Sequence, residues 1–142
     1  MKSRQSSVGR ELENFMIWWV PIGDRIPTNS RRLQHLADKL TDAISDTQTL
    51  VRLALKTSGN KARLEMIEAM VLNMESVRSI MDLFCEYCER HDHIHFISLK
   101  QKASYLKQVE SICRQIGGWE RKTRFLAAKE ENEANPEAGG ED

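Results

Sequence analysis

The densest group of potential metal ligands in the sequence is a run of cysteines and histidines near residue 90. Two cysteines three positions apart precede three histidines at alternate positions: Cys85, Cys88, His91, His93 and His95. Thiolate and imidazole are ligands that Zn²⁺ prefers. However, a zinc-binding C-x-x-C pair turns the backbone so that both sulfurs converge, whereas this pair belongs to a helical pattern. We therefore expect one packed thiol, one flanking thiol and a polar loop, with zinc binding as the alternative.

No pattern typical of catalysis is present in the sequence. It contains no G-x-x-x-x-G-K-[ST] phosphate loop, no G-x-G-x-x-G turn and no G-x-S-x-G nucleophile elbow. Asp38, Asp42 and Asp46 follow one another at intervals of four residues, which is typical of a solvated helix face. We predict that the protein is not an enzyme and needs no cofactor.

Charge is unevenly distributed along a chain that is neutral as a whole, with 21 bases and 21 acids. Residues 90–125 hold eight bases against three acids, whereas residues 126–142 hold one base against six acids. Lysines and arginines clustered on one element are typical of a phosphate-binding surface; a solvated face balanced by neighbouring acids is the alternative. The candidates in this segment are Lys100, Lys102, Lys107, Arg114, Arg121, Lys122 and Arg124. The acidic segment that follows is expected to oppose phosphate binding.

Two amphipathic patterns in the first half of the chain predict two helices. The first covers residues 8–20 and is expected to end at Pro21, which cannot donate a helical hydrogen bond. The second follows a cap at Thr28, Asn29 or Ser30 and ends in a turn at residues 57–60. Its apolar stripe consists of Leu33, Ala37, Leu40, Ile44, Thr47, Val51 and Ala54.

Two further patterns predict helices in the second half. The third helix has a seam with alternating spacings of three and four: Ile67, Met70, Met74, Val77, Met81, Phe84 and Cys88. The fourth follows a cap at Ser98, and its stripe consists of Leu99, Ala103, Leu106, Val109, Ile112, Cys113 and Ile116. Gly117 and Gly118 are expected to fray or end this helix, while Trp119 leaves open a continuation after a kink.

These patterns predict an all-α protein, an antiparallel up-down four-helix bundle. We expect a flexible N-terminus over residues 1–7, the bundle over 8–125 and an acidic disordered tail over 126–142, which is poor in apolar residues. The longest apolar run, residues 16–20, is too short to cross a bilayer, and no apolar signal segment is visible. Three cysteines imply no disulfide framework. We predict a soluble cytoplasmic protein that does not contact membranes.

Two adjacent tryptophans in the first predicted helix indicate contact with another molecule. Successive residues of a helix point about 100° apart, so Trp18 and Trp19 cannot both face the core. One of the two is expected to lie in an interface between subunits.

Several short motifs resemble those of the Avd family, the accessory variability proteins of diversity-generating retroelements. F-M-I-W-W-V-P at residues 15–21, followed by I-P-T-N-S-R-R-L at 26–33, is similar to the end of the family's first helix and its entry to the second. I-S-L-K-Q at residues 97–101 and I-G-G-W at 116–119 resemble the start and end of its last helix. The related bundles encoded in ribosomal RNA intervening sequences carry N-I-A-E-G where this chain has L-A-L-K-T at 53–57, which favours Avd.

The resemblance implies a non-enzymatic partner of a reverse transcriptase. Avd proteins form five-fold rings that bind the reverse transcriptase and template RNA and support mutagenic synthesis of complementary DNA. The resemblance also adds Arg31 and Arg32 to the candidate phosphate-binding residues. They lie at the start of the second helix, which presents free N–H groups to an anion. The alternative is an oligomeric scaffold without nucleic-acid binding, in which Trp18 or Trp19 is buried between subunits.

Overall fold

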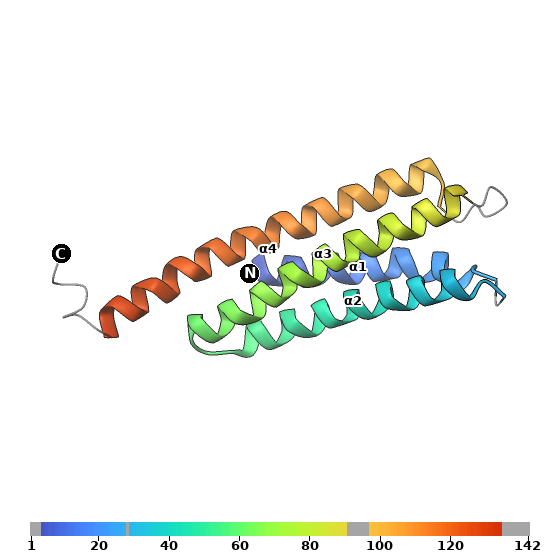
Figure 1. Ribbon diagram of the computed structural model, residues 1–142. Coiled ribbons are helices and arrows are strands. Elements are labelled where there is room, and N and C mark those ends of the chain that lie inside the picture. The colour runs from blue at the N-terminus through green and yellow to red at the C-terminus, as the bar shows by residue number, and fades with distance from the viewer. Residues whose placement is uncertain (1–3, 28, 91–96, 135–142) are drawn as a thin grey trace.

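The protein consists of four helices in the part of the chain that the structure describes. The computed structural model describes residues 4–27, 29–90 and 97–134. The helices are α1 (Arg4–Asp24), α2 (Arg31–Lys56), α3 (Asn60–Arg90) and α4 (Leu99–Ala134), as Figure 1 shows. The predicted all-α class is thereby confirmed. None of the helices described is both long and apolar enough to cross a lipid bilayer.

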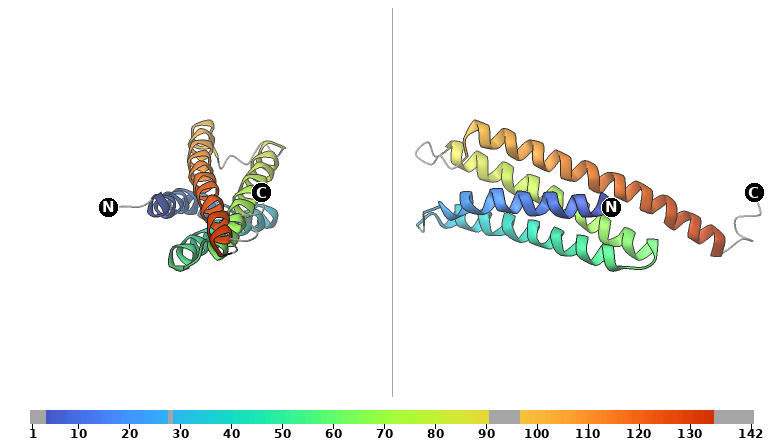
Figure 2. Two further views of the ribbon diagram at one scale, coloured as in Figure 1. Left: turned by 90° about the vertical axis from the view of Figure 1, so that its left-hand side faces the viewer. Right: turned by 180° about the vertical axis from the view of Figure 1, so that it is seen from behind.

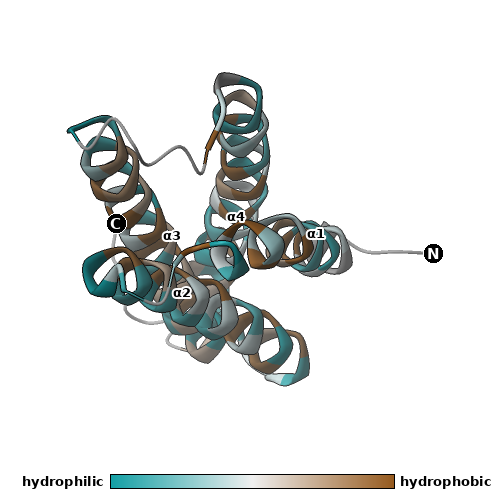
Figure 3. Ribbon diagram, turned by 90° about the vertical axis from the view of Figure 1, so that its right-hand side faces the viewer, coloured by the Kyte–Doolittle hydropathy of each residue, from teal (hydrophilic) through white to brown (hydrophobic). Residues whose placement is uncertain are grey.

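Successive helices run in opposite directions, which makes the bundle antiparallel (Figure 1). Each helix packs against its neighbours in the chain, and α1 also packs against α4. Among the described residues, the backbones of the diagonal pairs α1–α3 and α2–α4 do not approach each other closely, although side chains of α1 and α3 meet across the core. This is the predicted up-down arrangement. End-on views show that the C-terminal end of α3 and the N-terminal end of α4 diverge (Figures 2 and 3).

The core follows the predicted stripes of α2 and α3 closely. All seven predicted positions of α2 are buried, as are the first six of α3, while Cys88 is half-buried. Trp19 of α1 is fully buried: its ring meets Phe84 edge-on at 5.6 Å, and its Nε1 donates a hydrogen bond to Thr41 Oγ1 at 3.0 Å. The polar end of the largest core side chain therefore has a partner.

Both predicted boundaries of the first helix are wrong. The helix begins at Arg4, inside the segment expected to be flexible, and it continues through Pro21 to Asp24. Pro21 is exposed, so the carbonyl of Ile17 that loses its helical donor lies on the solvent side and can bind water. Residues 1–3 lie outside the described residues.

The prediction for the end of α4 is also wrong. The helix passes through Gly117 and Gly118, which is the continuation that Trp119 left open, but it also includes residues 126–134, which were expected to be disordered. Leu126 and Ala127 are half-buried, and Glu130 accepts a hydrogen bond from Asn60 at the start of α3. The alanines, lysine and glutamates of this segment are also strong helix formers. Residues 135–142 of the predicted tail lie outside the described residues.

The predicted apolar stripe of α4 is correct only in its second half, from Val109 onward. Val109, Ile112 and Ile116 are buried, whereas Ala103 is exposed and Leu106 is 55% exposed. Tyr105 takes the core position instead, against Phe15 at 6.0 Å. The divergence of α3 and α4 leaves Leu106 beside a groove rather than a packed helix.

The turns and caps explain where the helices begin. Ser98 Oγ accepts from the Gln101 backbone N–H at 3.1 Å, while Gln101 Oε1 accepts from the Ser98 N–H at 2.9 Å. This capping box confirms the predicted cap of α4. Ser30 is the N-cap of α2, but its side chain makes no capping hydrogen bond. Gly59 has φ of 92° in the α2–α3 turn, which only glycine adopts without strain.

Candidate nucleic-acid interface

Four of the predicted basic residues form one line along the outer face of α4. Lys100, Lys107, Arg114 and Arg121 are spaced by seven residues, and all four are exposed. Seven residues fall only about 20° short of two helical turns, so their side chains leave the helix in nearly the same direction. That direction is opposite to the buried Val109, Ile112 and Ile116. The line, which we call the α4 row, spans about 32 Å at 1.5 Å per residue.

The α4 row keeps most of its positive charge. Arg114 Nη2 lies 2.9 Å from Glu110 Oε1, but both side chains are 70% exposed. An exposed pair of this kind is worth about 0.2–1 kcal/mol, so a phosphate can compete for Arg114. Among the described residues, no ion pair involves Lys100, Lys107 or Arg121. The row can therefore release counterions when phosphates bind.

The other three basic candidates on α4 lie away from the α4 row. Arg124 faces α3, where Nη2 lies 3.1 Å from Glu68 and 3.3 Å from Glu120. Lys102 is half-buried on the side that faces α3, where its positive charge partly offsets the burial that raises the pKa of the Cys85 thiol. Lys122 is exposed and points about 100° around the helix from Arg121. Of the seven candidates on α4, only the four heptad-spaced residues form a line.

Arg31 and Arg32 belong to a separate surface. They line an open groove of about 390 Å³ between the start of α2 and the end of α3, together with His35, Leu36, Leu83 and Tyr87. Because all the lining residues belong to α2 and α3, this groove does not include the α4 row. The structure thus divides the predicted phosphate-binding residues between two faces.

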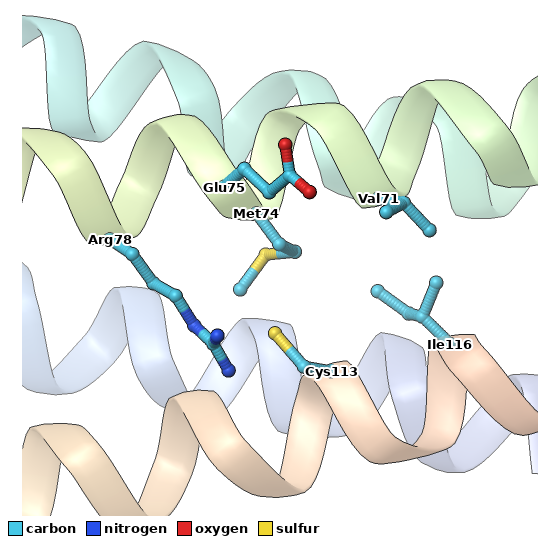
Figure 4. Close-up of a pocket in the computed structure, with 6 residues that line it drawn as sticks. All are labelled: Val71, Met74, Glu75, Arg78, Cys113 and Ile116. Atoms are coloured by element: carbon cyan, nitrogen blue, oxygen red, sulfur yellow. The ribbon is translucent and has the colours of Figure 1, made fainter.

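The groove between α3 and α4 is a poor anion site. Its narrow part is lined by Val71, Met74, Glu75, Arg78, Cys113 and Ile116, with Arg78 and Cys113 turned toward one another (Figure 4). Burial raises the pKa of the Cys113 thiol, and the smaller effect of the positive charge of Arg78 lowers it. The wider part adds Asp82 and Glu110. Acids from both helices, Glu75 among them, oppose an anion here.

The structure describes only part of the predicted metal-ligand cluster. Cys85 and Cys88 are half-buried on the last turns of α3, whereas His91, His93 and His95 lie outside the described residues. Within the described part of the chain, no group of three potential ligands lies close enough to hold a metal ion. Burial raises the pKa of the Cys85 thiol, which disfavours the thiolate that zinc requires.

Trp18 and Trp19 differ in burial, as expected for adjacent residues that point about 100° apart on a helix. Trp19 is buried, and Trp18 is half-buried between α1 and α4. The ring of Trp18 stacks on Phe15 at 5.8 Å and on Tyr105 at 6.4 Å. Trp18 thus has aromatic partners within the chain, and its role between subunits stays a prediction.

Sequence reasoning missed three features of the outer face of α4. Gly117 and Gly118 lie within the helix between Arg114 and Arg121, where they were expected to end it. Phe125, one turn beyond Arg121, is 68% exposed. Heptad counting from Lys100 would have found the continuous line, because each member of the α4 row is seven residues from the next.

Comparison of the chain with models of known protein families, with curated proteins and with solved structures finds no match in any of the three.

Proposed function

We propose that this chain is a non-enzymatic accessory protein of a diversity-generating retroelement, acting in the cytoplasm beside the reverse transcriptase. In this proposal the α4 row binds phosphates of the template RNA. Other faces contact the polymerase and further copies of the chain, with a pentamer as the expected assembly. The observation that carries the proposal is the line of four exposed cations on one helix face.

The motifs that resemble Avd lend support because they build the surface that carries the α4 row. In I-S-L-K-Q, Ser98 and Gln101 form the capping box that starts α4 next to Lys100. In I-G-G-W, Ile116 and Trp119 are buried and anchor α4 between Arg114 and Arg121. The two motifs thus fix both ends of one basic surface.

The α4 row is tested by removing its charge and comparing a matched variant. Replacing Lys100, Lys107 and Arg114 by Gln removes three cations from the row. Replacing the exposed Lys39, Arg52 and Lys61 of α2 and α3 by Gln removes the same charge elsewhere. Binding of a structured RNA is measured by fluorescence anisotropy at several salt concentrations. We expect the row variant to lose affinity and its log–log salt slope to become shallower by about 2, at about 0.7 per phosphate contact on single strands.

The two variants distinguish RNA binding by the α4 row from RNA binding that depends only on the net charge of the protein. Equal losses in both variants would show that only total charge matters and would contradict the row. Lack of binding by the wild type at low salt would contradict RNA binding altogether and favour the oligomeric scaffold. The exposed Ile17 and Val20 of α1 and Leu55 of α2 are apolar groups that such a scaffold would cover.

A further inference from the structure

The largest exposed aromatic side chain in the described part of the protein is surrounded by cations. Phe125 is 68% exposed on the outer face of α4. Arg121 and Lys122 lie four and three residues before it, and Lys129 lies four residues after it, so all three are neighbours of Phe125 on the helix surface. All three are exposed, and in the described part of the chain none of them is in an ion pair.

This environment does not suit an apolar subunit contact. Burying Phe125 against a second copy would also desolvate three cations, and an isologous contact would bring two such sets together. A partner that matches the surface must offer a flat apolar face together with negative charge. A nucleotide of an unpaired strand has both, because the base stacks on an aromatic ring while the adjoining phosphates meet the cations.

The glycine pair before Phe125 lies beneath the Arg121 side chain. A Cβ atom added at Gly117 would meet only the Arg121 side chain, Nη1 at 3.6 Å, and one at Gly118 would meet Nη2 at 3.9 Å. Both are ordinary contacts with the flexible end of a side chain, and neither glycine has a positive φ. The fold therefore does not require glycine at either position, although each glycine weakens the helix. Their absent side chains leave room for the Arg121 guanidinium, which lies over the α4 backbone at both glycines.

We infer that Phe125 is a base-stacking platform at the end of the α4 row, which makes the row selective for RNA with unpaired nucleotides over fully paired RNA. The α4 row supplies the phosphate contacts, and the ring of Phe125 supplies the contact that a duplex cannot make with its stacked bases. This inference rests on the proposed RNA binding. The acids Glu130, Glu131 and Glu133 mark the C-terminal limit of the site, one to two turns beyond the ring.

The test compares two RNAs on three full-length proteins. A fluorescein-labelled 12-nucleotide oligouridylate and a 12-base-pair RNA duplex are titrated with the wild type, Phe125→Leu and Phe125→Trp. Leucine keeps an apolar side chain without a π face, and tryptophan restores the π face. Leu106→Ala, which truncates another exposed apolar residue of α4, is the control. Mass by light scattering is measured for each protein.

We expect the wild type to bind the oligouridylate more tightly than the duplex. Phe125→Leu should bind the oligouridylate about 5- to 140-fold more weakly, the range that corresponds to stacking of one base. Its affinity for the duplex should equal that of the wild type. Phe125→Trp should bind the oligouridylate as tightly as the wild type does. The fluorescence of its added tryptophan should be quenched by the bound base. Leu106→Ala should behave as the wild type.

Two results would overturn the inference and leave RNA binding by the row intact. One is equal affinity of the wild type and Phe125→Leu for the oligouridylate. The other is a loss of oligomeric mass in Phe125→Leu, which would place the ring in a subunit contact. If the wild type bound neither RNA at 50 mM salt, the proposed function itself would fail.

Discussion

At the scale of single residues, stability depends on which side of α3 a side chain occupies. Met74 is 1% exposed on the α3 seam, whereas Leu72, two residues away, is 64% exposed. We predict that Met74→Asp places an unpaired carboxylate in the core and costs at least about 4 kcal/mol, most of the stability of a domain at the lower end of the ordinary range of about 5–15 kcal/mol. Leu72→Asp should change the free energy of unfolding by less than about 0.5 kcal/mol. Urea denaturation followed by circular dichroism measures both, and a normal transition in Met74→Asp would contradict the seam.

The half-buried thiols predict how stability depends on pH. Burial raises the pKa of both Cys85 and Cys113, with Lys102 and Arg78 respectively opposing the shift. Burial also raises the pKa of Tyr105. As pH rises, these groups lose their protons at a lower pH in the unfolded chain than in the folded protein, which favours the unfolded state. The free energy of unfolding should therefore fall above the ordinary thiol pKa of about 8.5. Below that pH these groups should add no pH dependence.

Two measurements check this prediction. Urea denaturation at pH 7 and pH 9.5 should give a lower free energy of unfolding at pH 9.5, with a smaller difference in Cys113→Ser. Alkylation by iodoacetamide at pH 8, mapped by mass spectrometry, should be slower at Cys85 and Cys113 in the folded protein than in urea. Equal alkylation rates in the two states would contradict the raised pKa values.

At the scale of elements, the glycines of α4 and of the α2–α3 turn should respond in opposite directions to alanine. Gly117→Ala and Gly118→Ala should each stabilise the protein by about 0.5–1 kcal/mol, because space is available and alanine favours a helix. Gly59→Ala should destabilise it by about 1 kcal/mol, because φ there is 92°. Thermal unfolding measures all three, and destabilisation by Gly117→Ala would reveal a contact that requires glycine.

Sequence periodicity predicted the interiors of the helices better than their ends. The α2 stripe and the α3 seam were predictable because each presents one apolar face to a continuous core. The extension of α4 to Ala134 depends on Asn60 and on the packing of Leu126, which are tertiary contacts that a local pattern does not contain. The passage of α1 through Pro21 depends on an exposed carbonyl, which is known only once the helix is placed.

The candidate site was predicted by residue type but not by geometry. Seven basic residues of α4 were identified from charge, and heptad spacing separates four of them as a line, but it is the position of the core that shows that this line faces solvent. Phe125 was missed because its exposure is a property of the packed bundle: helical spacing alone does not identify which face of α4 meets solvent.

At the scale of the whole molecule, the end of α4 is part of the folded body. Deleting residues 126–142 should lower the free energy of unfolding by about 1–3 kcal/mol, because it removes the half-buried Leu126 and Ala127 and the Asn60–Glu130 hydrogen bond. Deleting residues 135–142 leaves every contact described above in place and should not change it. Urea denaturation of the two truncations measures the difference, and equal stabilities would contradict a structural role for residues 126–134.

The shorter truncation should also change RNA binding. It removes Glu137, Glu141 and Asp142 while α4 stays intact, so affinity should rise at low salt. A gain in affinity that persists at high salt would contradict an electrostatic cause.

Packing between neighbours in the chain also governs how the bundle folds. Contacts between α2 and α3 join segments on either side of a three-residue turn, so this hairpin can form early with little loss of loop entropy. Contacts between α1 and α4, such as the hydrogen bond from Ser111 to Glu11, join distant parts of the chain and should form after the transition state. In stopped-flow experiments, truncating Phe15 or Tyr105 should therefore accelerate unfolding and leave the refolding rate nearly unchanged, whereas truncating Met70 should slow refolding.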